Sequence, residues 1–163
     1  MIRSVNKKDF PQIKEIAMKG WTATYTYLSP NDLNRLVNEY YSDRNLKKSM
    51  DRVKTGKGLF IVAETGKKII GFSHVAIHGD EGELVRIYMD LEHEGKGIGT
   101  KLLIDCETFL RRKGCRKYFA YIHKDNKRGL NFYLKNGFIH VKKRDKEDEF
   151  KNGKILLYLE KSF

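Results

Sequence analysis

The glycine-rich segment 94–100, which reads Glu-Gly-Lys-Gly-Ile-Gly-Thr, is the part of the sequence that most clearly predicts chemistry. It follows a strand pattern at 83–89 and opens an amphipathic helix pattern that continues to about residue 112. A glycine turn at the start of a helix presents unpaired backbone N–H groups and the positive end of the helix dipole. Such a turn favours phosphate oxygens, so we expect a phosphate-bearing ligand at this segment.

Two common phosphate-binding motifs fit this segment poorly. A dinucleotide fingerprint follows the first strand of a βαβ repeat and has an acidic residue at the end of the next strand. Here the loop follows the fourth predicted strand, and the next strand, 118–122, is followed by His123. A Walker loop needs Gly-Lys-Ser/Thr after its last turn, whereas Gly99 is followed by threonine and then lysine. A second feature is therefore needed to identify the ligand.

The elements that must position the loop can be predicted from hydrophobic periodicity and capping residues. Asn6, Ser29 and Asn126 are predicted to start helices, and the last two strands are predicted to be joined by a charged, mobile connection. The order β–α–α–α–β–β–β–α–β–α–β–β predicts an α/β (α+β) fold with one mixed sheet and helices packed on it. The strands are expected at 2–5, 59–63, 69–77, 83–89, 118–122, 138–141 and 155–159.

The composition predicts one soluble globular domain over residues 1–163, with 40% hydrophobic and 33% charged residues. No apolar run approaches the roughly 20 residues of a membrane span, and no secretory apolar core follows Met1, so a cytoplasmic location is expected. Cys106 and Cys115 are too few for a disulfide framework and are expected to be core thiols. The five histidines are scattered without metal-ligand spacing, so no metal is expected.

The net charge of +12 predicts attraction to polyanions, which include nucleic acid, acidic lipid and polyphosphate cofactors. Basic runs occur at 111–113, 116–117 and 142–144. These runs lack the interleaved aromatic residues that stack on bases, so nucleic acid is the less favoured partner. The alternative is a solvated, lysine-rich surface without a polyanionic partner.

The second informative feature is the segment 126–138, Asn-Lys-Arg-Gly-Leu-Asn-Phe-Tyr-Leu-Lys-Asn-Gly-Phe. Together with the glycine loop it resembles the GNAT superfamily of acyl-CoA-dependent N-acetyltransferases. The resemblance covers 83–110 and 118–141 and includes the preceding hairpin. It implies acetyl-CoA as the cofactor and a mixed, mostly antiparallel sheet, flanked by helices, whose central parallel strands splay apart to admit the pantetheine arm.

The resemblance also implies roles for individual residues. The backbone of the strand before the loop would hold the thioester carbonyl, the loop would hold the pyrophosphate, and the start of the next helix would contact the pantetheine arm. Tyr133 would be the catalytic acid that protonates the departing thiolate, although it also reads as a core residue beside Phe132. The implied cofactor-binding residues are Ile87, Tyr88, Met89, Glu94, Gly95, Lys96, Gly97, Ile98, Gly99, Thr100, Asn126, Gly129 and Tyr133.

Two acidic residues raise separate questions. The family loop is usually Gln/Arg-x-x-Gly-x-Gly/Ala, and Glu94 departs from it at the first position. A carboxylate near a pyrophosphate predicts lowered affinity or an altered geometry, while the backbone N–H groups remain able to bind. Glu83 lies where many relatives of the superfamily place a general base acting through water, although it equally reads as a charged strand end. Glu81 is the next candidate.

The acceptor is expected to bind near the aromatic segment 20–28, which contains Trp21 and Tyr25. This segment and the following helix resemble the PaiA-like spermidine/polyamine acetyltransferases, which implies a small amine attacked directly in a ternary complex. Acidic residues that would supply local negative charge for such an amine are Glu39, Asp43, Glu81 and Glu83. The same aromatic residues also read as a packing corner between two helices.

The charge of +12 repels polycations at long range, so a peptide or protein N-terminal amine is the main rival acceptor. A non-catalytic module that binds acyl-CoA or nucleic acid is the alternative from another class. The sequence leaves a homodimer open.

Overall fold

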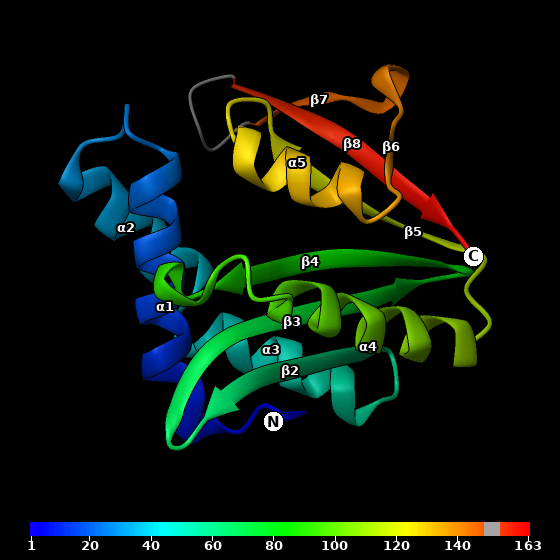
Figure 1. Cartoon of the computed structure of the whole chain (residues 1–163), viewed down its shortest axis with the longest axis horizontal. Coiled ribbons are helices and arrows are strands. Elements are labelled where there is room, and N and C mark those ends of the chain that lie inside the picture. Colours follow the sequence, from blue (N-terminus) through cyan, green and yellow to red (C-terminus); the bar gives the residue numbers. More distant parts are fainter. Residues whose placement is uncertain (149–153) are drawn as a thin grey trace.

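The computed structural model describes residues 1–148 and 154–163. Its strands form one sheet in the order β1-β2-β3-β4-β5-β8-β6, with β7 also paired to β8 (Figure 1). The strands are β1 (Ile2–Ser4), β2 (Gly58–Thr65), β3 (Lys68–His78), β4 (Glu81–Met89), β5 (Lys117–His123), β6 (Ile139–His140), β7 (Lys146–Asp148) and β8 (Lys154–Ser162). The helices are α1 (Phe10–Thr24), α2 (Pro30–Tyr40), α3 (Asp43–Lys54), α4 (Ile98–Arg112) and α5 (Lys127–Lys135), with short 3-10 turns η1 (Lys7–Asp9), η2 (Leu91–His93) and η3 (Lys142–Arg144). This architecture confirms the predicted mixed sheet.

The central pair of strands is joined over a short stretch. β4 and β5 run parallel, and their register covers only 81–83 against 117–119. On its other edge β4 pairs with β3 antiparallel, where His74 faces Arg86 and Val75 faces Leu84. Val85 is therefore an extra residue in β4, and a bulge of this kind bends the strand that carries it. Figure 1 shows the outcome: β4 and β5 meet near the C-terminus and diverge from there.

Helices cover both faces of the sheet. Alternate residues of each strand point to opposite sides, and buried side chains on both sides pack against helices. In β2, Phe60 and Val62 belong to one buried cluster, which also contains residues of α1, α2 and α3. The neighbouring Ile61 and Ala63 belong to the other cluster, with residues of α4 and β5. Cys106 and Cys115 are buried in this second cluster and unpaired, which confirms that they are core thiols.

The predicted helix starts are confirmed by their hydrogen bonds. The Ser29 hydroxyl accepts from the Asp32 N–H ahead of Pro30 at the first position of α2. Asn6 forms a capping box with Asp9 that introduces η1 and α1. No helix among the described residues combines the length and the apolar character needed to cross a membrane.

The prediction of a mobile charged connection before the last strand was wrong for residues 142–148. η3 is followed by β7, which pairs antiparallel with 154–156 of β8. The Asp145 carboxylate accepts from the Tyr158 N–H at 2.8 Å and so ties the segment to β8. Hydrogen bonds to a neighbouring strand outweigh the low strand propensity of these charged residues. Residues 149–153 of the same connection lie outside the described part of the chain.

Candidate active site

A cavity of about 1020 Å³ lies where β4 and β5 separate. Its wall combines the ends of α1 and α2, the second half of β4, the glycine loop, the end of β5, α5 and β7. The structure therefore gathers segments that are far apart in the sequence. The sequence-predicted residues that line it are Trp21, Tyr25, Ile87, Tyr88, Met89, Glu94, Gly95, Gly97, Ile98, Gly99, Thr100, Asn126, Gly129 and Tyr133.

The glycine loop has the geometry of an anion cradle. Gly97 is the N-cap of α4 with a φ of 75°, a left-handed conformation that favours glycine. The first backbone hydrogen bond of the helix runs from the Lys101 N–H to the Gly97 carbonyl at 3.1 Å. Helix geometry consequently leaves the N–H groups of 98–100 without intrahelical acceptors. These residues line the cavity, so the donors fit phosphate oxygens in it.

Glu94, the unusual acid of the loop, is paired with a cation. Its carboxylate accepts from the Arg128 guanidinium on α5 at 3.2 Å, and both side chains are partly exposed. The pair neutralises the carboxylate that would otherwise repel a pyrophosphate. It also joins the glycine loop to α5 across the cavity wall, which both residues line.

We expect Glu94→Gln to tighten coenzyme A binding by about 2- to 5-fold, because partly exposed charge interactions contribute up to about 1 kcal/mol. The substitution removes the negative charge and leaves Arg128 available to a phosphate. Calorimetric titration with coenzyme A measures the effect, which should shrink as salt is added. Glu92→Gln is the matched control, since Glu92 is an exposed carboxylate of the neighbouring turn that does not line the cavity. Weaker binding by Glu94→Gln would contradict this interpretation.

Among the described residues, the edge of β4 that faces β5 has no strand partner beyond Glu83. On the opposite edge, residues 86–89 pair with 71–74 of β3. Because backbone groups alternate between the two edges of an antiparallel strand, alternate residues of 84–89 direct their N–H and C=O groups into the cavity. These groups fit an extended, amide-containing arm lying beside the strand.

The start of α5 is held close to β5. Asn126 is the N-cap, and its Oδ1 accepts from the Gly129 N–H at 2.9 Å. A Cβ at position 129 would lie 2.6 Å from Ile122 Cδ1 and 2.8 Å from Asn126 Nδ2. A larger residue at 129 would therefore displace the ends of these two side chains, so glycine suits the close approach of α5 to the end of β5.

Tyr133 lines the cavity from α5 and is 7% exposed. Its ring packs edge-on against Phe138, with ring centroids 5.0 Å apart. Burial raises the pKa of the Tyr133 phenol, so the hydroxyl keeps its proton at neutral pH. A buried phenol that retains its proton meets the first requirement of a general acid.

The end of the cavity next to α1 and α2 is aromatic and acidic. Trp21 packs against Tyr25 and Tyr40, with centroid distances of 5.3 Å and 5.4 Å. Asp148 of β7 lines the same cavity and is 6% exposed. Desolvation, together with the Asp148 charge, raises the pKa of Tyr40 to about 12. An aromatic wall beside a buried carboxylate is suited to an ammonium group.

His123 also belongs to this end of the cavity, and no sequence motif marked it. Its Nδ1 accepts from the Asp125 N–H at 3.3 Å, so the ring proton lies on Nε2. That nitrogen lies 3.1 Å from the Tyr27 hydroxyl and donates to it. The position of His123 directly after the predicted strand 118–122 is the signal that could have singled it out.

The structure separates five predicted residues from this cavity, since Glu39, Asp43, Glu81, Glu83 and Lys96 are not among its lining residues. The Glu83 carboxylate hydrogen-bonds His78 Nε2 at 2.8 Å, and Glu81 pairs with Lys117 at 3.3 Å. Both acids lie in the stretch where β4 and β5 are still paired, before the splay begins. The hypothesis that Glu83 is the general base therefore gains no support from its position.

The predicted basic runs are partly engaged within the chain. The Arg111 guanidinium lies 4.7 Å from the centroid of the Phe163 ring, and Arg144 lies 4.3 Å from that of Tyr158. Arg116 forms an ion pair with Asp80. Through these contacts several of the basic residues pack against other parts of the chain, so they do not form a free surface for a polyanion.

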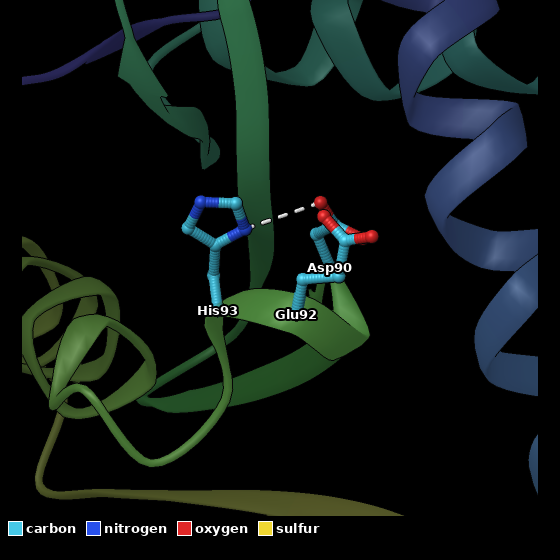
Figure 2. Close-up of side chains that lie close together, drawn as sticks. All are labelled: Asp90, Glu92 and His93. Carbon is cyan, nitrogen blue, oxygen red and sulfur yellow. Dashed lines mark hydrogen bonds and ion pairs between the residues drawn. The ribbon is translucent and has the colours of Figure 1, made fainter.

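Asp90, Glu92 and His93 lie close together at η2 (Figure 2). This cluster was not predicted, because the histidines are scattered in the sequence. His93 Nδ1 lies 3.2 Å from the Asp90 carboxylate. The Lys68 ammonium lies 2.9 Å from Asp90 and 3.6 Å from Glu92. Because a lysine already compensates both acids, we assign no metal to this cluster.

The comparisons with known proteins agree with this geometry. The model of the acetyltransferase (GNAT) family matches residues 12–138. The chain is 32% identical over 139 residues to a spermidine N(1)-acetyltransferase of Thermoplasma acidophilum, covering 84% of this chain and 86% of that protein. The chain therefore belongs to the GNAT family of acetyltransferases, acyltransferases that use acetyl-CoA.

Solved structures support the same conclusion. The PaiA N-acetyltransferase of Thermoplasma acidophilum, solved in complex with coenzyme A, superposes with a TM-score of 0.84 at 28% identity, covering 100% of this chain and 98% of that one. Ard1 of Thermoplasma volcanium superposes with a TM-score of 0.77 at 16% identity, covering 99% and 96% of the two chains, and shows a shared fold.

Proposed function

We propose that this protein transfers the acetyl group of acetyl-CoA to a primary amine of a polyamine such as spermidine, by direct attack in a ternary complex. The observation that carries the proposal is the aromatic end of the cavity, where Trp21, Tyr25 and Tyr40 line the same cavity as the buried Asp148. The similarity to a spermidine N(1)-acetyltransferase supports the same acceptor class.

The proposed roles of the chain follow from the geometry. Bound acetyl-CoA supplies the activated acetyl thioester. The N–H groups of 98–100 hold the pyrophosphate, and the unpaired edge of β4 orients the pantetheine arm and polarises the carbonyl. Tyr133 would donate the proton that the departing sulfur requires, and the proton that the amine nitrogen loses on forming the amide would restore the Tyr133 phenol. The aromatic wall and Asp148 bind the cationic part of the acceptor.

Local charge resolves the objection that a protein of net charge +12 repels polycations. At physiological salt, long-range repulsion between exposed charges is screened with a Debye length of about 8 Å. A buried carboxylate in a cavity acts at shorter range and in a lower effective dielectric, where each charge interaction is stronger. Asp148 and the aromatic faces therefore determine binding once the acceptor has entered.

An acceptor comparison at fixed acetyl-CoA tests the proposal. Release of free coenzyme A thiol is measured with spermidine, with short diamines and with peptides that have free N-termini. We expect kcat/KM for spermidine to exceed that for the peptides by at least about 10-fold, because one well-placed charge interaction accounts for such a factor. Peptide turnover far above spermidine turnover would reject the polyamine assignment and leave acetyl transfer to amines intact.

A further inference from the structure

One face of the strands β5, β8 and β7 forms part of the wall of the active-site cavity. In the strand register Tyr121 faces Tyr158, and His123 faces Leu156, which in turn faces Lys146 of β7. Residues directly opposite each other in antiparallel strands lie on the same face of the sheet, and so do residues two apart in one strand. The members of this row that line the cavity are Tyr121, His123, Leu156 and Lys146.

This face meets the aromatic wall of the acceptor end. Asp148 lies two residues after Lys146 in β7 and therefore on the same face. At the other side of the row, the Tyr25 ring of the α1 end lies edge-on to the His123 ring, with centroids 5.3 Å apart. The lining that suits an ammonium group consequently extends from α1 over His123 to Tyr121.

An ammonium group of the chain itself already lies on the Tyr121 ring. Lys146 Nζ lies 4.0 Å from the centroid of that ring, which is within the range of a cation–π contact. Tyr121 is half-buried, whereas Lys146 is exposed. The structure therefore shows an ammonium group bound to an aromatic face at the wall of the cavity.

The Lys146 contact is easier to break than the neighbouring contact of Arg144 with Tyr158. The Arg144 guanidinium lies 4.3 Å from the Tyr158 ring centroid and also donates to the Tyr158 hydroxyl at 2.8 Å. Within residues 1–148 and 154–163, the Lys146 ammonium has neither a hydrogen-bond acceptor nor an ion-pair partner, so the ring alone holds it. An exposed cation–π contact is weak, and a second ammonium group can displace it.

We propose that Tyr121 is a second cation subsite of the acceptor, which binds an ammonium group other than the acetylated one and which Lys146 occupies in the free protein. This inference rests on the proposed transfer to a polyamine, because only an acceptor with several ammonium groups fills two sites. The acceptor displaces the Lys146 ammonium into solvent. The charges of β7 that then remain at the cavity are the carboxylates of Glu147 and Asp148, which suit a polycation.

The test is a double-variant cycle on spermidine binding to the protein saturated with coenzyme A, measured by calorimetry at constant ionic strength. Lys146→Met removes the competing ammonium, Tyr121→Leu removes the ring, and a third protein carries both changes. Lys143→Met is the control, since it removes the same charge from an exposed residue of η3 that does not line the cavity. Butylamine, which has one ammonium group, is the comparison ligand.

We expect Lys146→Met to tighten spermidine binding by about 3- to 10-fold, with changes under about 2-fold for butylamine and in Lys143→Met. In the Tyr121→Leu background, Lys146→Met should change spermidine binding by under about 2-fold, because the ring that it would release is missing. Equal tightening with and without the ring would mean that Lys146 acts through charge repulsion alone and would overturn the proposal. An unchanged affinity in Lys146→Met would overturn it as well.

Spermidine binding and spermidine acetylation are measured separately, so that the subsite and the proposed function fail independently. The expected coupling without acetyl transfer would reject spermidine as the acceptor and keep Tyr121 as a polyamine-binding residue. Acetyl transfer without the coupling would reject the subsite and keep the acceptor. Where Tyr121→Leu fails to fold, the ring signals of Tyr121 in ¹H–¹³C spectra decide: spermidine should shift them and butylamine should not, and signals that spermidine leaves unmoved would overturn the proposal.

Discussion

Tyr133→Phe is expected to lower kcat by about 100-fold or more while leaving the affinity for coenzyme A within about 2-fold, since general acid catalysis contributes 10²–10⁴-fold. The substitution removes only the hydroxyl from a side chain that is 7% exposed in the cavity wall. Initial rates at saturating acetyl-CoA measure the chemical effect, and calorimetry with coenzyme A measures binding.

Tyr118→Phe is the matched control for Tyr133→Phe. Tyr118 is also buried and also packs edge-on against Phe138, at a centroid distance of 4.8 Å. Its hydroxyl bonds Glu107 at 2.6 Å and does not line the cavity. We expect Tyr118→Phe to reduce stability by about 1 kcal/mol and to leave kcat nearly unchanged. Equal loss of kcat in both variants would show that Tyr133 acts through packing and would remove it as the acid.

Asp148→Asn is expected to raise the KM for spermidine by about 10-fold or more, because a hydrogen bond to a charged group contributes roughly 1.5–3 kcal/mol. The variant keeps the shape of the side chain and removes its charge. Asp148 is 6% exposed beside the aromatic wall, so little water screens its interaction with an ammonium. Steady-state kinetics with spermidine at saturating acetyl-CoA give the KM.

Two comparisons make this result specific. Glu39→Gln removes an exposed carboxylate that does not line the cavity, and it should leave the KM unchanged. A simple monoamine lacks the additional ammonium groups of spermidine, so Asp148→Asn should affect its KM much less. The same rise in KM for both amines would mean that Asp148 supports β7 and does not recognise the acceptor.

The fold was predictable because its signals are local. Hydrophobic alternation marked most strands, and Ser29-Pro30 and Asn126 fixed helix starts by side-chain caps that need only the adjacent residues. β7 escaped prediction since its charged residues pair with β8, and a partner strand cannot be read from the segment itself. The bulge at Val85 is likewise a property of the β3–β4 register and leaves no residue signature.

The residues of the candidate site also fall into two groups, those that a sequence motif marked and those that only the structure identifies. The glycine loop, the β4 edge and Tyr133 lie in two contiguous motifs, and the structure brings them to one cavity. His123 and Asp148 enter that cavity from segments without a motif, and Arg128 lies in the 126–138 segment but had no role assigned to it, so only the folded arrangement identifies these three residues. Glu39 was chosen for its charge, and Glu83 also for its place at the start of a strand where relatives of the superfamily have a general base. Neither criterion specifies which side of a sheet or helix a residue occupies.

The single extra residue in β4 has a consequence for how a ligand enters. Because the bulge at Val85 and the short 81–83 register keep β4 and β5 apart, the facing edge of β4 beyond Glu83 has no strand partner among the described residues. The free-energy cost of leaving these backbone groups of β4 without a partner strand is therefore part of folding and not of binding. The gap is thus preorganised, and under the proposed function a pantetheine arm would pair with β4 without first breaking hydrogen bonds to another strand.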